Sequence, residues 1–132
     1  MPDNASDSTV TLAILKRKMA EFVADREWQK FHLPKNLAMS LAVEAAELME
    51  LFQWRTPDEI DALVCDRGFR ERLAEEMADI LAFLLSLANV TDTDLSGAFE
   101  QKMASNERKY PADKVRGTYS KPSSDPPTAR AC

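Results

Sequence analysis

Along most of this chain, apolar side chains return every three or four positions. The first such run lies between about Thr9 and Arg26 and consists of Leu12, Leu15, Met19, Phe22 and Val23. This spacing places the apolar side chains on one face of a helix, so it predicts an amphipathic helix. The same rhythm predicts three further helices, over about 37–52, 69–88 and 95–110.

Short polar motifs mark the predicted helix boundaries. Thr56, Pro57 and Glu59 are typical of a helix start, because a threonine and a glutamate three residues later can cap each other's backbone N–H groups. They predict a short helix that ends near Cys65. We interpret Gly68 as a turn before the long helix that follows.

The ends of the chain differ from its middle. Residues 1–8 are polar, and residues 112–132 are rich in proline, serine and threonine, so both segments are predicted to be flexible. Thr93 or Asp94 is expected to cap the last helix, which Pro111 ends. One helical domain is therefore expected over residues 9–111.

Composition supports an all-α fold. The middle of the chain is dominated by strong helix formers such as alanine, leucine and glutamate, and the 132 residues include only three glycines. We predict a four-helix-bundle type of fold. The apolar surface of residues 77–90 is larger than one small bundle can cover, which favours a homodimer or homotetramer in which two copies share helices.

Charge and cysteine usage exclude some partners. The formal net charge of −5 argues against binding to a nucleic acid polymer, because such proteins normally carry a basic face. The most apolar window, residues 80–90, is too short to cross a membrane, and the N-terminus lacks the features of a signal peptide. Two distant cysteines give no disulfide framework, so a cytoplasmic location is expected.

Two acidic pairs carry the candidate chemistry. Glu44 and Glu47 lie three residues apart on one predicted helix, and Glu76 and Asp79 are spaced in the same way on another. Each pair therefore projects from one side of its helix, beside an apolar stripe. Four converging carboxylates would repel one another unless they bind a cation, and all-oxygen ligands favour Mg²⁺, with Mn²⁺ as a substitute, over zinc or copper.

Two other interpretations of the acids must be considered. An acidic helix face is often merely solvated, and Glu50, Glu71 and Glu75 fit that description. A di-iron bundle needs histidines three residues after its glutamates, but the single histidine, His32, lies outside both helices. The sequence therefore leaves a hard-cation site or a solvated face.

An ordered set of motifs then resembles a known family. These motifs are Trp28-Gln29-Lys30-Phe31-His32-Leu33-Pro34-Lys35-Asn36-Leu37, Glu44-x-x-Glu47, Leu51-Phe52-Gln53-Trp54, Glu75-Glu76-x-x-Asp79, Lys102-x-x-x-Asn106 and Lys109-Tyr110-Pro111. From about Leu12 to Pro111 the chain is similar to MazG-like nucleotide pyrophosphohydrolases, and most of all to their dCTP pyrophosphatase branch. The resemblance implies an all-α oligomer that cleaves nucleoside triphosphates to monophosphates and pyrophosphate.

The resemblance also implies roles for single residues. Glu44, Glu47, Glu76 and Asp79 match the Mg²⁺ ligands. Trp28, His32 and Trp54 match residues that line the base pocket, whereas Lys102, Asn106, Lys109 and Tyr110 match groups that meet the triphosphate. Two positions depart from the family pattern: Val43 stands where many members have glutamate, and Phe83 replaces a tyrosine that contacts substrate in close relatives.

The residue types suit this chemistry by themselves. Hydrolysis of a triphosphate requires neutralised phosphate charge and a water molecule held in line, and Glu47 is our candidate for the base that takes the proton of that water. Lys102 and Lys109 would neutralise the outer phosphates. The residue types do not decide the base; the family resemblance implies cytosine deoxynucleotides, modified ones included, as the substrates, with dUTP and damaged purine nucleotides left open. The competing interpretation is a non-catalytic helical interaction module.

Overall fold

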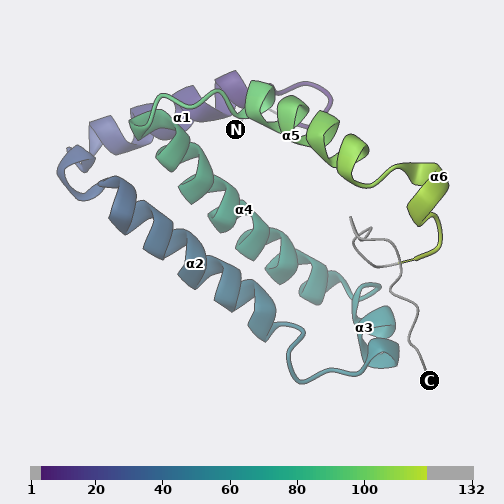
Figure 1. The fold of residues 1–132 in the computed structure, drawn as a ribbon. Helices are drawn as coiled ribbons and strands as arrows, with labels where there is room; N and C mark the ends of the chain where they lie inside the picture. Colours follow the sequence, from purple (N-terminus) through teal and green to yellow (C-terminus); the bar gives the residue numbers. More distant parts are fainter. Residues whose placement is uncertain (1–3, 119–132) are drawn as a thin grey trace, which may run out of the picture. The chain divides into compact units, whose positions relative to one another are not determined.

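The structure is a computed structural model that describes residues 4–118. In this part of the chain every regular element is helical, which confirms the predicted all-α class. In chain order the elements are α1 (Leu12–Asp25), the 3-10 helix η1 (Gln29–Phe31), α2 (Pro34–Glu50), α3 (Pro57–Leu63), α4 (Arg67–Val90), α5 (Leu95–Lys109) and α6 (Ala112–Val115) (Figure 1). None of the described helices is long and apolar enough to cross a membrane.

The described chain divides into two compact units. The first ends at Thr93 and contains α1 to α4, and the second begins at Asp94 and contains α5 and α6. The helix α6 lies within the segment 112–132 that was predicted to be flexible, and residues 119–132 of that segment are outside the described part. The expected domain limits at residues 9 and 111 stay a prediction.

The first unit is organised around a hairpin of two long helices. Figure 1 shows α2 and α4 side by side and running in opposite directions, and α1 also packs on α4. The buried apolar side chains of this unit are Val23, Leu37, Phe69, Leu85 and Ala88. At one end of the hairpin, the rings of Phe52 and Phe69 meet edge to face with centroids 5.7 Å apart.

The short helix α3 starts as its sequence predicts. The Thr56 hydroxyl accepts a hydrogen bond from the backbone N–H of Glu59 at 3.3 Å, and the Glu59 carboxylate accepts one from the backbone N–H of Thr56 at 2.7 Å. Pro57 occupies the first helical turn, where its missing N–H leaves no hydrogen bond unmade. The predicted capping box is therefore confirmed.

Two predicted boundaries were wrong, both for local reasons. Gly68 does not form a turn; it lies in the first turn of α4, because the Asp66 carboxylate accepts a hydrogen bond from the backbone N–H of Phe69 at 2.7 Å and starts the helix there. Helix α2 begins at Pro34 rather than near Leu37, since the fixed φ of proline suits the first helical position.

A reciprocal pair of hydrogen bonds ties α1 to the end of α4. The Asn89 side chain donates to the backbone carbonyl of Lys16 at 2.8 Å, and the Lys16 ammonium donates to the backbone carbonyl of Thr93, also at 2.8 Å. The connector before α2 is held in a similar way, because Asn36 donates from its side chain to the carbonyl of Phe31 at 3.3 Å. These bonds hold α1 and η1 in place at the end of the hairpin where α2 begins and α4 ends.

The ring of Phe69 is expected to be a main source of stability. It is only 1% exposed, so Phe69→Ala should lower the free energy of unfolding by about 3–5 kcal/mol through lost burial and a residual cavity. Urea unfolding followed by circular dichroism at fixed protein concentration measures this change. Arg67→Ala is the matched control, because the Arg67–Glu71 ion pair in the same turn is exposed and is worth at most about 1 kcal/mol. Equal losses in the two variants would contradict the prediction.

Candidate metal centre

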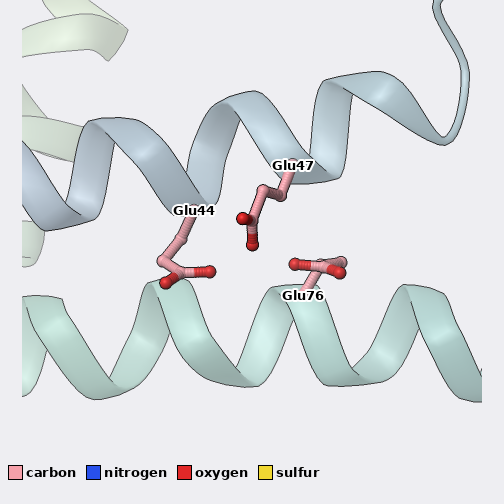
Figure 2. Close-up of side chains that lie close together, drawn as sticks. All are labelled: Glu44, Glu47 and Glu76. Carbon is pink, nitrogen blue, oxygen red and sulfur yellow. The ribbon is translucent and has the colours of Figure 1, made fainter.

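Three carboxylates from two helices converge in the middle of the hairpin. Glu44 and Glu47 lie one turn apart on α2, so their side chains share one face of that helix. Because α4 runs antiparallel beside α2, Glu76 faces them from the opposite side (Figure 2). One carboxylate oxygen from each of the three residues lies within 4.8 Å of the others. The structure thus brings together three of the four acids that the sequence analysis selected.

The environment of Glu44 disfavours its charged form. Desolvation by partial burial is the largest cause that raises the pKa of this carboxyl above 4.5. A side-chain hydrogen bond with Glu47 raises it further, and so do the negative charges of Glu47, Asp79 and Glu76. Burial and neighbouring negative charges both raise the pKa of a carboxyl group, so all of these causes act in the same direction.

Glu76 experiences the same opposition from the other helix. Desolvation is again the largest cause that raises its pKa above 4.5, followed by the negative charges of Glu47 and Asp79. Its Oε2 atom is buried and has no hydrogen-bond partner among residues 4–118. A buried acceptor without a partner is costly, so this oxygen is suited to bind a cation.

The donor set fits a hard divalent cation. Mg²⁺ binds oxygen ligands at about 2.0–2.1 Å, so two oxygens on one ion lie at most about 4.2 Å apart. The oxygens of Glu44, Glu47 and Glu76, which lie within 4.8 Å of one another, are close to this spacing. Carboxylates alone do not offer the nitrogen or sulfur donors that zinc and copper sites generally use. These three residues would hold the ion.

Asp79 stands next to this group rather than within it. It lies on α4 one turn after Glu76 and is exposed. Its negative charge raises the pKa of both Glu44 and Glu76, so it belongs to the same electrostatic cluster. Its role as a direct ligand stays a prediction.

A cavity of about 390 Å³ adjoins Glu44. It lies between α2 and α4 and is lined by Asn36, Met39, Ser40, Val43, Glu44 and Phe83. The structure therefore places Phe83, a predicted substrate-binding residue, beside a candidate metal ligand. The sequence analysis missed Asn36 and Ser40 as site residues, although they precede Glu44 at steps of four and so share its helix face.

The residues expected to line a base pocket are separated within one chain. Trp28 and His32 flank η1, before α2, whereas Trp54 follows the other end of α2 and is 85% exposed. The 17 residues of α2 span about 25 Å at 1.5 Å per residue. His32 lines a second cavity of about 270 Å³ between α1, η1 and α4, and the ring of Trp28 packs edge to face on Phe22 with centroids 5.9 Å apart. A shared pocket for these residues stays a prediction.

The four residues expected to meet the triphosphate belong to the second unit. Lys102, Asn106 and Lys109 lie on α5 at steps of four and three, so they share one face of that helix. Tyr110 caps its end, with the Lys109 ammonium 5.4 Å from the centroid of the tyrosine ring. Their contact with phosphate also stays a prediction.

Comparison with known proteins decides the family. The model of the MazG-like family matches residues 39–123, which include all four acids. The chain belongs to the MazG-like family. This confirms the resemblance that the motifs indicated, and it accounts for the all-helical fold.

Individual relatives agree with this assignment. The chain is 41% identical to dCTP pyrophosphatase 1 of Bos taurus over 114 residues, which are 86% of this chain and 68% of that protein. It is also 41% identical to dCTP pyrophosphatase 1 of Homo sapiens over 111 residues, 84% of this chain and 65% of the human protein. The chain thus spans about two thirds of the length of these relatives. Their names also confirm the predicted likeness to the dCTP pyrophosphatase branch.

A solved structure supports the fold. The crystal structure of a pyrophosphatase from Archaeoglobus fulgidus superimposes with a TM-score of 0.71 and 39% sequence identity, over 82% of this chain and 99% of that one. The prediction that the chain is a hydrolytic enzyme agrees with what these relatives are.

The raised pKa values predict how the metal-free protein responds to pH. Glu44 and Glu76 bind protons more tightly in the folded chain than in the unfolded chain, so above pH 4.5 the folded state carries more protons than the unfolded state. The stability of the folded state therefore falls as the pH rises from 4.5 through the raised pKa values of these two groups. Glu76→Gln should make the unfolding temperature less dependent on pH between 4.5 and 7.5 in EDTA. At pH 7.5, Mg²⁺ at ten times its dissociation constant should stabilise the native chain by about 1.4 kcal/mol.

Differential scanning fluorimetry measures both effects. Glu50→Gln is the control on α2, because Glu50 is exposed and outside the cluster. The interpretation fails if Glu76→Gln and Glu50→Gln change the pH dependence equally, or if Mg²⁺ stabilises neither the native chain nor the control.

Proposed function

We propose that this chain is a Mg²⁺-dependent nucleoside triphosphate pyrophosphohydrolase that converts dCTP, or a modified dCTP, to the monophosphate and pyrophosphate. The observation that carries the proposal is the convergence of Glu44, Glu47 and Glu76 beside a cavity between α2 and α4. The names of the relatives support both the reaction class and the base. Removal of unwanted nucleotides from the cytoplasmic pool is the corresponding role.

The three carboxylates differ in exposure, and this suggests how they divide the work. Glu44 and Glu76 are half-buried and have raised pKa values, so a cation is the partner that stabilises their charged forms. When bound, Mg²⁺ or Mn²⁺ neutralises charge on the phosphate oxygens and polarises the phosphorus centre. Glu47 is exposed, so a water molecule can reach its carboxylate, which supports its assignment as the general base.

The reaction balances with these groups alone. Water forms a bond to phosphorus as the bridge between the α and β phosphates breaks, pyrophosphate leaves, and the Glu47 carboxylate takes the proton of the water. Asp79, whose negative charge raises the pKa of Glu44 and Glu76, would help to hold a cation near the cluster. Lys102 and Lys109 are proposed to receive the departing pyrophosphate.

Removal of the proposed base should abolish turnover. Glu47→Gln keeps the size of the side chain but cannot take a proton, so kcat for dCTP should fall by about 100-fold or more. Asp79→Asn should behave similarly if Asp79 is a ligand. Pyrophosphate release with Mg²⁺ over a panel of ribo- and deoxynucleoside triphosphates measures this, and circular dichroism checks that helical content is kept.

Glu71→Gln is the matched control, since Glu71 is exposed on α4 and pairs with Arg67. Wild-type turnover in Glu47→Gln would refute the base assignment. No release of pyrophosphate by the native chain from any nucleotide, under Mg²⁺ and Mn²⁺, would instead favour the helical interaction module.

An oligomer is part of the same proposal. The described chain has few buried apolar side chains, whereas many large ones are more than half exposed. Those on α2 and α4 are Met39, Val43, Met49 and Met77. Exposed apolar surface on the two site-bearing helices supports a second copy that packs against the hairpin. Such a copy could also place its own Trp54 near η1 of the first copy.

Light scattering after gel filtration tests the oligomer. The native protein should have a mass of at least twice 14.8 kDa, which corresponds to a dimer or a tetramer. Met49→Glu should lower that mass, because it places a charge on the exposed apolar face. Glu50→Gln, at the next position, should leave it unchanged. A native mass of 14.8 kDa would contradict the proposal.

A further inference from the structure

The cavity beside the acidic cluster contains a side-chain amide whose orientation is fixed by the fold. Asn36 lies in the first turn of α2 and lines the cavity of about 390 Å³ together with Glu44. Its side-chain nitrogen, Nδ2, donates to the backbone carbonyl of Phe31 in η1 at 3.3 Å. A carbonyl oxygen can only accept a hydrogen bond, so the amide cannot turn over without bringing two oxygens together. The nitrogen of Asn36 therefore stays directed toward η1.

This orientation leaves the amide oxygen of Asn36 as the free end of the side chain. Phe31 lies outside the lining of the cavity, so the nitrogen is engaged by a group that a ligand in the cavity does not displace. Asn36 is exposed, and a ligand can therefore reach its side chain. The Oδ1 atom is then the acceptor that Asn36 offers to a group in the cavity.

The lining of the cavity extends away from the acidic cluster on both helices. On α2, Ser40 and Asn36 lie about 6 Å and about 12 Å from Glu44 along the helix axis. On α4, Phe83 lies about 10 Å beyond Glu76, in the same direction because the two helices are antiparallel (Figure 1). A nucleotide whose phosphates bind a cation at Glu44 therefore has its sugar beside Ser40 and its base between Phe83 and Asn36.

Most of the lining cannot distinguish one base from another. The ring of Phe83 offers a π-face on which every base can stack, and Met39 and Val43 add apolar surface. Ser40 has a hydroxyl, which can either donate or accept a hydrogen bond. The amide of Asn36 is the group of defined polarity at the end of the cavity away from the acids, so it is the group that can select a base.

We propose that Asn36 is a specificity-determining residue whose Oδ1 accepts a hydrogen bond from the exocyclic amino group of cytosine. The inference rests on the proposed function and adds to it the group that chooses the base. Cytosine presents an amino donor at the position where a uracil or thymine base presents a carbonyl acceptor. With dUTP, two acceptors would face each other. The contact therefore tolerates cytosine bases modified at carbon 5, which keep the amino group, and disfavours deaminated ones.

The hydrogen bond to η1 arranges the amide before any substrate binds. Asn36 belongs to a helix of 17 residues, and its side chain is already held by the Phe31 carbonyl. Little side-chain freedom is then lost when the base binds, so the contact keeps most of its strength. A site that is built to hydrogen-bond one group also rejects the analogue that lacks it, because the protein atom is left without a partner.

Asn36→Ala tests the proposal on the full chain with Mg²⁺ present. The ratio of kcat/KM for dCTP to kcat/KM for dUTP should fall by about 5- to 10-fold, because only dCTP loses a hydrogen bond. Lys35→Ala is the matched control: Lys35 is exposed in the same helical turn, outside the cavity lining, and the ratio should not change. Equal losses for dCTP and dUTP in Asn36→Ala would show a structural role and overturn the inference. A native chain without preference for dCTP over dUTP would overturn it too.

A second measurement separates this inference from the proposed function. In ¹⁵N-labelled native protein with Mg²⁺, dCMP should shift the side-chain amide signals of Asn36, and dUMP should bind about 5- to 10-fold more weakly. Pyrophosphate release from dCTP with no shift of the Asn36 signals by dCMP would overturn the inference and leave the proposed function standing. Shifts at Asn36 that favour dCMP over dUMP, without hydrolysis of any nucleotide, would support the base contact and refute the reaction.

Discussion

The candidate metal centre of the first unit requires that three carboxylates be kept close together despite their mutual repulsion. Apolar contacts at both ends of the hairpin make this possible: Leu37 is buried near the start of α2, and Phe52 packs on Phe69 at its other end. The acids lie between these two contacts, where the helices cannot separate to relieve the charge. Burial therefore raises the pKa of Glu44 and Glu76, and cation binding becomes the favourable way to keep them ionised.

Features that depend on neighbouring residues were predictable from the sequence. The capping box at Thr56 and the shared helix face of Glu44 and Glu47 follow from local geometry, and the structure shows both. The cavities were not predictable in this way, because Met19 reads as one more apolar position of its helix until η1 and α4 are packed against it. Gly68 shows the opposite error, since a strong aspartate cap overrides the usual preference of glycine for turns.

Family membership explains more than the order of the motifs. It agrees with the all-helical fold and with the structural likeness to an archaeal pyrophosphatase. A single copy nevertheless separates Trp54 from Trp28 and His32 by the length of α2, so motif order did not translate into proximity. An assembly of copies can unite residues that one chain keeps apart.

The link between α2 and α4 has a consequence for how this fold can vary. Antiparallel helices in bundles are commonly joined by about 2–8 residues, but here residues 51–66 intervene and contain α3, which caps its own N-terminus. The register of the acids is set by the packing of α2 on α4 and not by the length of this link. Insertions and deletions should therefore accumulate between Gln53 and Cys65 during evolution, leaving the alignment of Glu44, Glu47 and Glu76 undisturbed.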